Sequence, residues 1–509
     1  MRSGAADSAE RTSAPSDVAP GGATLRRLLL ALLTIGALLL RVRYLGEAMR
    51  VDESFSYTAY AARPLSYGLT HYTGNNHLFH TLLVHLTTRA LWNSPVIVRL
   101  PALVAGVALV PATYLMASRL FSRTAGLIAA ALVAVSPPLV AYSVNARGYG
   151  IVSLVFVLLL WLGPALVRSE RLGAWWLHAA LATIGFYTIP VMAFAFGGYS
   201  VWLIATALTH TAVDRRRFAR RWIVSTAGAG AATLLLYTPV FAVAGTKVVF
   251  ANPYAAPVSF RAWRAGLPHL AADTWTFWNA GVPVVLAVVV AVAFIAGLLR
   301  QRRETSRIPV AFPILAWILL QLAVQRVLPF PRIWLFLVPL YLAIAAAGIA
   351  WAVDAIATRV PVRAVLAPAV AIVLAGALAA SLVGYEAIED SHESGRLPDA
   401  EAVTVYLAGH AGSRVRVLAV TPAQDPLRYY FALHGLNVRT LDRPLRNADR
   451  LIVVVDTWEH GSLAAALRGT AAATAGPGGV VTVRSFAPAF VLRRFPTATL
   501  YEFDRLTSR

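Results

Sequence analysis

Two polar clusters stand near the amino end of an otherwise apolar chain. The first is Val51-Asp52-Glu53-Ser54, and the second is Thr73-Gly74-Asn75-Asn76-His77-Leu78-Phe79-His80. Paired carboxylates followed by amide and imidazole side chains can supply a general base, substrate hydrogen bonds or metal ligands. Ionisable groups among membrane spans are costly and mark functional sites. The loop that carries both clusters is therefore the first place to look for chemistry.

The composition of the chain is that of a polytopic membrane protein. Of its 509 residues, 58% are hydrophobic and 14% are charged, whereas about 25% are charged in soluble domains. The formal net charge of +21 comes from arginine, because Lys247 is the only lysine. Short arginine clusters between apolar runs are typical of topology determinants beside anionic lipid. We therefore expect the lipid bilayer, and no nucleic acid, as a partner; without cysteine the chain has no thiolate metal site.

The apolar segments predict about eleven transmembrane helices of the length needed to cross the hydrocarbon core. They lie near residues 24–44, 97–118, 124–143, 149–167, 174–190, 191–209, 222–243, 282–299, 309–326, 333–353 and 363–384. The segment from His77 to Trp92 is apolar but rich in histidine, so we expect an interfacial or re-entrant helix. With that assignment the arginine clusters fall on one side, as the positive-inside rule requires. The amino terminus is then cytoplasmic and the Asp52-Glu53 loop lies outside.

The same topology predicts the domain organisation. Residues 1–23 are polar and form a disordered cytoplasmic tail; residues 24–384 form the transmembrane domain, with its first outer loop at 46–96. Residues 385–509 predict a small extracytoplasmic α/β domain, with strands near 415–420, 451–455 and 490–494 and a helix near 426–434. The fold class expected is mostly α. The lysine-poor, alanine- and arginine-rich composition is typical of a GC-rich bacterial genome, which indicates a bacterial cytoplasmic membrane.

Three further polar features fall on the predicted outer face. They are Asn145-Ala146-Arg147-Gly148-Tyr149, the loop from about Gly245 to Gly281, and Arg326-Val327-Leu328-Pro329-Phe330-Pro331-Arg332. A guanidinium group matches phosphate oxygens in two-point geometry, so Arg147 and Arg332 are candidate phosphate ligands. Neither has an obvious carboxylate partner in the sequence. The plainer alternatives are snorkelling arginines and, for Tyr149, an aromatic-belt anchor.

The order of these motifs resembles the polytopic GT-C glycosyltransferases, particularly the protein O-mannosyltransferase and aminoarabinose-transferase-like group. After the two clusters come Arg99-Leu100-Pro101, then Arg119-Leu120-Phe121-Ser122-Arg123-Thr124-Ala125-Gly126, then Ser136-Pro137 followed by Tyr142-Ser143-Val144-Asn145-Ala146-Arg147-Gly148-Tyr149. The resemblance covers roughly residues 24–165 well and 331–341 weakly. The terminal domain carries no signature.

The resemblance implies an inverting enzyme that transfers a sugar, mannose or arabinose-like, from a polyprenyl-phosphate carrier to a hydroxyl of a glycan, lipid or protein acceptor. Asp52 is the expected catalytic base. The expected donor or substrate contacts are Glu53, Asn75, Asn76, His77, Arg147, Tyr149 and Arg332. Glu53, His77 and His80 are alternative ligands of a divalent cation, Mg²⁺ or Mn²⁺. Relatives often have His-Pro-Pro-Leu where this chain reads Asn75-Asn76-His77-Leu78. Either Asn75 or His77 can take the place of the family histidine, so the sequence does not decide whether a metal is bound.

Other interpretations stay open. Asp52 and Glu53 are also suited to the first turn of a surface helix, and Glu53 is a candidate structural partner for an arginine. A lipid-linked glycan ligase or polymerase of another fold would also act outside the membrane, without needing the early Asp-Glu loop. A transporter would carry ionisable groups near mid-membrane and repeated halves, and a noncatalytic assembly protein would tolerate loss of Asp52.

Overall fold

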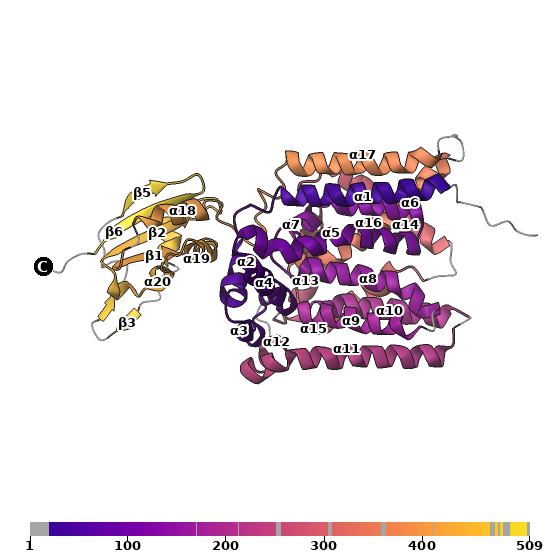
Figure 1. The fold of residues 1–509 in the computed structure, drawn as a ribbon, viewed down its shortest axis with the longest axis horizontal. Helices are drawn as coiled ribbons and strands as arrows, with labels where there is room; N and C mark the ends of the chain where they lie inside the picture. Colours follow the sequence, from indigo (N-terminus) through magenta and orange to yellow (C-terminus); the bar gives the residue numbers. More distant parts are fainter. Residues whose placement is uncertain are drawn as a thin grey trace, which may run out of the picture.

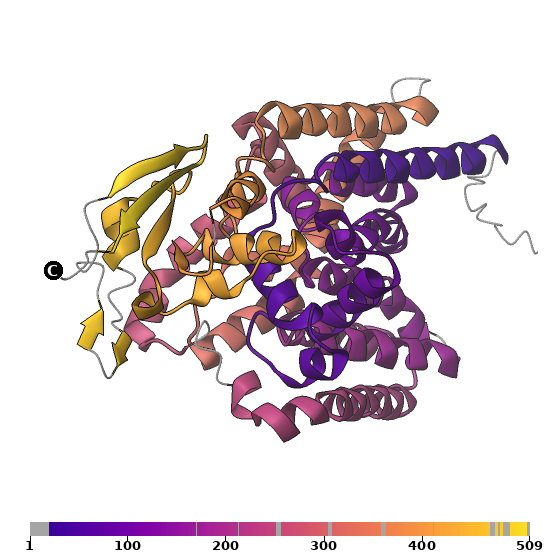
Figure 2. The same ribbon diagram turned by 60° about the vertical axis from the view of Figure 1, so that its left-hand side comes forward.

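The computed structural model describes residues 20–168, 171–211, 213–250, 256–303, 308–357, 363–410, 412–468, 474–476, 479–481 and 489–505. These parts form a bundle of long, nearly parallel helices with a smaller sheet-containing domain at one end (Figure 1). The second view shows the sheet domain at the same end of the bundle (Figure 2). The short helices of the first loop lie between the two parts (Figure 1).

The helices up to residue 384 fall into two groups. The long ones are α1 (Pro20–Val42), α5 (Pro95–Leu120), α6 (Arg123–Val135), α8 (Tyr149–Arg168), α9 (Leu172–Thr188), α10 (Met192–Thr209), α11 (Arg215–Ala244), α13 (Phe260–Trp278), α14 (Val284–Arg303), α15 (Ala311–Gln325), α16 (Val338–Ala357) and α17 (Arg363–Gly384). The short ones are α2 (Val51–Ser56), the π-helix η1 (Tyr57–Ala61), α3 (Leu65–Thr70), α4 (Leu78–Ala90), α7 (Pro137–Ala141), α12 (Lys247–Phe250) and the 3-10 helix η3 (Pro331–Leu337).

Local sequence signals explain several helix ends. α5 begins with Pro95 in its first turn, and the Ser94 side chain accepts a hydrogen bond from the Ile97 N–H, which satisfies a donor that the helix leaves free. α6 ends at Val135 because Ser136 is extended and the residue before a proline avoids the helical region. The predicted span 124–143 is therefore two helices, α6 and α7.

The mostly helical fold class is confirmed, and a helix lies in each predicted span. The number of spans is not confirmed. Within the described residues, six helices are long and apolar enough to cross a membrane, and three apolar helices are shorter. The six are Pro95–Leu120, Tyr149–Arg168, Met192–Thr209, Arg215–Ala244, Val284–Gln301 and Pro331–Ala355; the three are Arg123–Val135, Ala311–Gln325 and Pro368–Gly384.

Three other predictions from the sequence concern the segments that form α4, α1 and α13. The helix predicted from His77 to Trp92 is α4, whose 13 residues extend about 20 Å, less than a bilayer core of about 30 Å. Most of the predicted tail, residues 1–19, lies outside the described residues, but α1 already begins at Pro20. The predicted loop 245–281 is wrong over α13, where Ser259 caps a 19-residue helix.

The bundle has an inner and an outer layer. The apolar windows of α5 and α8 are 67% and 72% buried, whereas that of α11 is 17% buried. An apolar helix with so little of its surface covered by protein needs lipid around it. The structure is thus that of a membrane protein.

The carboxyl-terminal part contains a four-stranded sheet in the order β1-β2-β6-β5. β1 pairs in parallel with β2, and the other pairs are antiparallel. The strands are β1 (Val415–Ala419), β2 (Arg450–Asp456), β5 (Phe490–Arg494) and β6 (Ala498–Asp504), with a separate pair β3 (Thr474–Gly476) and β4 (Gly479–Val481). The helices are α18 (Ala400–Ala408), α19 (Gln424–Leu433), α20 (Arg439–Asp442), η4 (Leu445–Asn447) and α21 (Leu463–Arg468). The three predicted strands and the helix before Gly435 are confirmed; β6 was missed.

The sheet domain packs directly on the first loop. Tyr429 of α19 meets Tyr57 edge to face, with ring centroids 5.4 Å apart, and its hydroxyl donates to Asn93 Oδ1 at 3.2 Å. The Met49 N–H donates to the Tyr430 hydroxyl at 3.3 Å. One apolar cluster contains buried residues of both parts, so the first loop is held from two sides.

Candidate active site

Glu53 is a fully buried carboxylate in α2. Its Oε2 accepts hydrogen bonds from Arg99 Nε at 3.0 Å and from the Ala146 N–H at 2.8 Å. Its Oε1 accepts from the Arg50 N–H at 2.8 Å and from Arg99 Nη2. Glu53 thus joins α2, α5 and the loop before α8. Of the three roles open to it, the structure supports that of partner to an arginine.

We expect Glu53→Gln to destabilise the protein strongly. The substitution leaves the Arg99 guanidinium, only 1% exposed, without a counter-charge, and breaking a buried ion pair in this way costs about 3–5 kcal/mol. The measurement is the melting temperature of the purified chain in detergent. The double variant Glu53→Leu/Arg99→Met should recover part of the loss, because it buries no unpaired charge. A melting temperature unchanged in Glu53→Gln would contradict this role.

Asp52, the neighbour of Glu53, is less constrained. Its side chain is 15% exposed, and Arg332 Nη2 lies 3.5 Å from its Oδ2. Asn75 Nδ2 lies 3.5 Å from its Oδ1. Both contacts are at the long limit for a hydrogen bond. Asp52 therefore keeps lone pairs with which it can accept a hydrogen bond from a further partner. Glu53 does not, because its carboxylate already accepts four hydrogen bonds.

Arg147 is buried in the loop between α7 and α8. Its Nη1 donates to Ser56 Oγ at 2.6 Å and to the Asn75 carbonyl at 2.8 Å, and its Nη2 donates to Asn75 Oδ1 at 3.1 Å. Its Nε is buried without a hydrogen-bond partner. In the described part of the chain no carboxylate pairs with Arg147. Three of the five guanidinium N–H groups thus have acceptors, and the Nε–H has none among the described residues.

His77 precedes α4 and contacts the same loop. Its Nδ1 accepts a hydrogen bond from the Gly148 N–H at 2.8 Å, so the neutral ring carries its proton on Nε2. That nitrogen is buried and has no partner among the described residues. The ring meets Tyr149 edge to face at 5.1 Å between centroids. A side chain at Gly148 would collide with Thr188 and crowd His77, so glycine permits this approach.

Arg332, in η3, faces two carboxylates. Its Nη1 donates to Glu393 Oε1 at 3.0 Å, and its Nη2 is the group that faces Asp52. Its Nε, like that of Arg147, is buried and has no hydrogen-bond partner in the part of the chain that the structure describes. The expectation that Arg332 has no carboxylate partner is therefore wrong. The chain that follows α17 lies at this end of the bundle and places Glu393 next to Arg332.

These contacts close into a ring. The Tyr142 hydroxyl donates to Glu393 Oε1 at 3.0 Å, and its aromatic ring meets Tyr149 with centroids 5.2 Å apart. The Arg147 guanidinium lies over the Tyr149 ring at 5.9 Å. The ring of contacts contains Asp52, Asn75, His77, Arg147, Tyr149 and Arg332, all predicted from the sequence, together with Tyr142 and Glu393. We refer to these eight residues as the polar ring.

Asn76 acts inside its own loop. Its Nδ2 donates to the carbonyls of Gly68 at 2.8 Å and His71 at 2.7 Å, and its Oδ1 accepts from Thr81 at 2.7 Å. Both amide hydrogens are used. In this structure the Asn76 side chain holds the loop together and has no donor left for a substrate.

The alternative metal site does not fit the geometry. Among the described residues, no group of three histidine, cysteine, aspartate or glutamate side chains is placed to hold a metal ion. The Glu53 carboxylate already accepts a hydrogen bond from Arg99, and His77 Nδ1 accepts one from the Gly148 N–H. His80 Nε2 is buried with no partner. The positive charge at this site comes from arginines.

The two buried histidines of this site, His77 and His80, predict a loss of stability in acid. Burial, reinforced by Arg147, lowers the pKa of His80 to about 3 and that of His77 well below the ordinary value of 6.5. Both titrate near 6.5 when unfolded, so below that pH the unfolded state binds more protons and stability falls. One pH unit below 6.5, each histidine costs about 1.4 kcal/mol. We expect the melting temperature to drop between pH 7 and 5.

The control for this prediction is the exposed His269. His80→Leu should make the drop in melting temperature between pH 7 and 5 smaller, because only His77 of the pair then remains, whereas His269→Gln should leave the drop unchanged. An identical pH profile for His80→Leu and the unsubstituted chain would contradict the assignment.

Sequence reasoning missed the segment after α17. Arg50 Nη1 donates to the carbonyls of Ser391 at 2.7 Å and Glu393 at 2.8 Å, and its Nη2 donates to that of Ile388 at 2.8 Å. These bonds hold the segment against the start of α2. The available signal was the acidic run from Glu386 to Glu393 directly after the last predicted span. The motif Arg99-Leu100-Pro101 did not predict that Arg99 pairs with Glu53.

Comparisons with known proteins extend these observations. Residues 77–206 match the family model described as Dolichyl-phosphate-mannose-protein mannosyltransferase. The crystal structure of ArnT from Cupriavidus metallidurans bound to undecaprenyl phosphate is similar over 95% of this chain and 98% of that one, at a TM-score of 0.57 and 13% identity. The chain has a GT-C fold.

A second solved structure agrees with the GT-C fold. The oligosaccharyltransferase AglB from Archaeoglobus fulgidus, in complex with an inhibitory peptide and a dolichol-phosphate, is similar at a TM-score of 0.54 and 10% identity, over 84% of this chain and 69% of that one. No curated protein matches the sequence. The resemblance to GT-C glycosyltransferases is thus confirmed at the level of the fold.

Proposed function

We propose that this protein is an inverting glycosyltransferase that moves a mannose or arabinose-like sugar from a polyprenyl-phosphate carrier to an acceptor hydroxyl. The observation that carries the proposal is the polar ring. It places Asp52, a carboxylate with unused lone pairs, between Asn75 and Arg332. Ionisable groups gathered at one end of an apolar bundle are expected at a functional site.

The reaction is a single displacement at the anomeric carbon. The acceptor oxygen forms the new bond to that carbon while the bond from the carbon to the phosphate oxygen breaks. The hydroxyl proton passes to the Asp52 carboxylate, which acts as general base. The electron pair of the broken bond leaves with the carrier phosphate. No general acid is needed, because a phosphate leaves as a stable anion.

Arg147 and Arg332 are the groups suited to that anion. Each has a buried Nε without a hydrogen-bond partner, and a preorganised donor aimed at developing negative charge lowers the barrier. Arg332 would exchange its contacts with Asp52 and Glu393 for phosphate oxygens, which also frees Asp52 to accept a proton. His77 Nε2 is a third buried donor in the same ring.

The similar structures support this choice of donor. ArnT was crystallised with undecaprenyl phosphate, and AglB with a dolichol-phosphate and an inhibitory peptide. Both ligands are polyprenyl phosphates of the class that the polar ring would accommodate. A glycan, lipid or protein acceptor is compatible with the same chemistry.

The test is transfer by the purified full chain in liposomes. Labelled mannose and labelled arabinose, each on a polyprenyl-phosphate carrier of bacterial length, are supplied as donors, and release of sugar-free carrier is followed. We expect one donor to be consumed by the unsubstituted chain and neither by Asp52→Asn. Consumption of neither donor by the unsubstituted chain, or equal consumption by Asp52→Asn, would contradict the proposal.

We further propose that the polar ring lies on the outer face of a bacterial cytoplasmic membrane, with the amino terminus inside; the arginine distribution supports this orientation. We expect a reporter fused at Arg216 to be cytoplasmic and reporters at Asn76 and after Asp399 to be exported. An exported reporter at Arg216 would overturn this orientation.

A further inference from the structure

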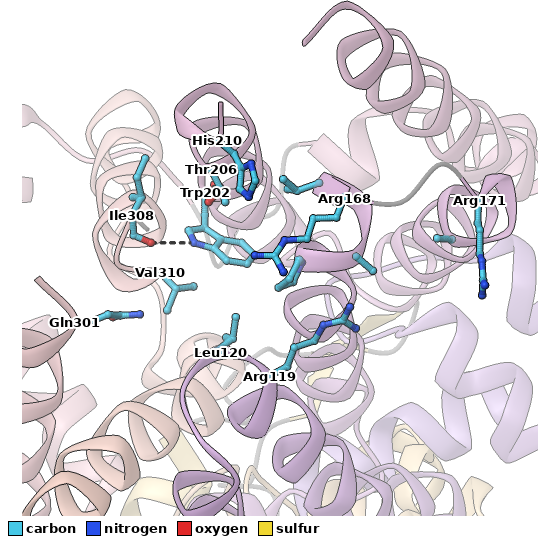
Figure 3. Close-up of a pocket in the computed structure, with 14 residues that line it drawn as sticks. Arg119, Leu120, Arg168, Arg171, Trp202, Thr206, His210, Gln301, Ile308 and Val310 are labelled. Carbon is cyan, nitrogen blue, oxygen red and sulfur yellow. Dashed lines mark hydrogen bonds between the residues drawn. The ribbon is translucent and has the colours of Figure 1, made fainter. Parts of the chain in front are cut away.

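A second polar region lies at the other end of the bundle. Tyr149 of the polar ring begins α8, and Arg168 ends the same helix 19 residues later, about 29 Å away along its axis. A cavity of about 610 Å³ opens there between the ends of α5, α8 and α10 and the chain around Ile308 (Figure 3). The polar ring does not use this cavity.

The cavity is positively charged. Arg119, Arg168, Arg171 and His210 line it, and none of its fourteen described lining residues is acidic. In Figure 3 the Arg168 side chain extends to beside Trp202, the Arg119 side chain lies below that of Arg168, and Arg171 lies farther off. Within the described residues neither Arg119 nor Arg168 forms an ion pair; Arg119 lies over the Trp161 ring at 5.7 Å. Two like charges, those of Arg119 and Arg168, with no ion-pair partner among the described residues favour an anion between them.

Some polar side-chain atoms of the cavity wall have a hydrogen-bond partner in the described part of the chain, and others do not. The Trp202 indole is fixed by a hydrogen bond to the Ile308 carbonyl at 3.3 Å. His210 Nδ1 and Gln301 Oε1 are buried and have no hydrogen-bond partner among the described residues, whereas buried polar atoms ordinarily have one. The remaining lining is apolar and includes Leu120, Pro164 and Val310. The cavity therefore combines an anion-binding rim with an apolar floor.

Two simpler explanations account for the presence of the arginines but not for their arrangement around the cavity. Arginines in the last turns of α5 and α8 complement the helix dipoles, and arginines are enriched on the cytoplasmic side of membrane proteins. Either effect is satisfied by side chains that point into solvent. Neither requires two guanidinium groups to share a cavity with an anchored tryptophan and unpartnered polar atoms.

We propose that this cavity binds the head group of an anionic phospholipid. The arginines would hold the phosphate, and the apolar floor would take the glycerol and the first acyl carbons. Basic pockets between transmembrane helices bind such head groups. A free phosphate ion offers nothing to the apolar floor, so the lipid is the ligand that uses both halves of the cavity.

The experiment measures binding of phosphatidylglycerol to the purified full chain in phosphatidylcholine nanodiscs, with native mass spectrometry to count retained lipid. We expect retention of phosphatidylglycerol in preference to phosphatidylcholine. Arg119→Ala/Arg168→Ala should weaken that binding about 20-fold. The matched control is Arg216→Ala/Arg220→Ala, which removes two exposed arginines at the start of α11, at the same end of the bundle.

Three outcomes would overturn the proposal. They are equal retention of the two lipids, equal weakening by the cavity and control variants, and displacement of the lipid by millimolar inorganic phosphate, which would assign the cavity to the free ion. Melting temperatures of both double variants in detergent establish that they fold, so a loss of lipid reports on the cavity itself.

Discussion

Asp52→Asn is expected to abolish sugar transfer while leaving folding and membrane insertion intact. The substitution removes basicity with almost no change in volume, and loss of a positioned general base costs two or more orders of magnitude in rate. Because the Asp52 side chain has only long contacts, to Arg332 and Asn75, the melting temperature should change little. The measurement is initial transfer rate in liposomes, at saturating donor.

The matched control for this prediction is Asp273→Asn, which neutralises an exposed carboxylate on α13. It should retain the full rate. Transfer by Asp52→Asn within tenfold of the unsubstituted chain would reject Asp52 as the base. A lowered melting temperature would instead assign it a structural role, such as holding Arg332 in place.

The contrast between Asp52 and Glu53 was not available from the sequence. Two adjacent carboxylates at the start of a helix look equivalent, and the resemblance to GT-C enzymes gives both a role. The difference arises from tertiary packing: Arg99, 46 residues away, and the Ala146 N–H, 93 residues away, converge on Glu53. Long-range partners of this kind leave no local pattern.

Periodicity and hydropathy predicted the long helices well, because each apolar run is much longer than a turn. They did worse where polar and apolar residues mix. α13 was taken for a loop, although Ser259 is a good helix cap, because Arg261, Arg264 and Asp273 interrupt its apolar pattern. The break at Ser136 was hidden for the opposite reason: the apolar run continues through Pro137 and Pro138, although the helix does not.

The site itself was predicted where its residues stand in motifs and missed where they do not. Asp52 and His77 lie in the two polar clusters of the first outer loop, and Arg147 lies in the Asn145-Ala146-Arg147-Gly148-Tyr149 motif. Glu393 lies in a connecting segment whose position depends on Arg50 and three backbone carbonyls. Glu393 matters to the proposal, because a carboxylate that already pairs with Arg332 would compete with a phosphate for the same guanidinium.

Arg147 and Arg332 are expected to bind the carrier phosphate rather than the sugar. Both carry a buried Nε without a partner, and a guanidinium binds phosphate through two parallel hydrogen bonds. Arg147→Ala and Arg332→Ala should each weaken binding of sugar-free polyprenyl phosphate at least tenfold. Arg→Lys at either position should also be poorly tolerated, since lysine keeps the charge but loses the planar fork.

Arg264→Ala, which removes an exposed arginine from α13, is the control and should bind the carrier normally. The two sites are expected to differ in one respect. Because Glu393 shares Arg332, Glu393→Gln should tighten binding of the carrier phosphate in the unsubstituted background and have no such effect in Arg332→Ala. If both alanine variants bind the carrier as tightly as the unsubstituted chain, neither arginine holds the phosphate, and both are anchors of the loops that surround Asp52.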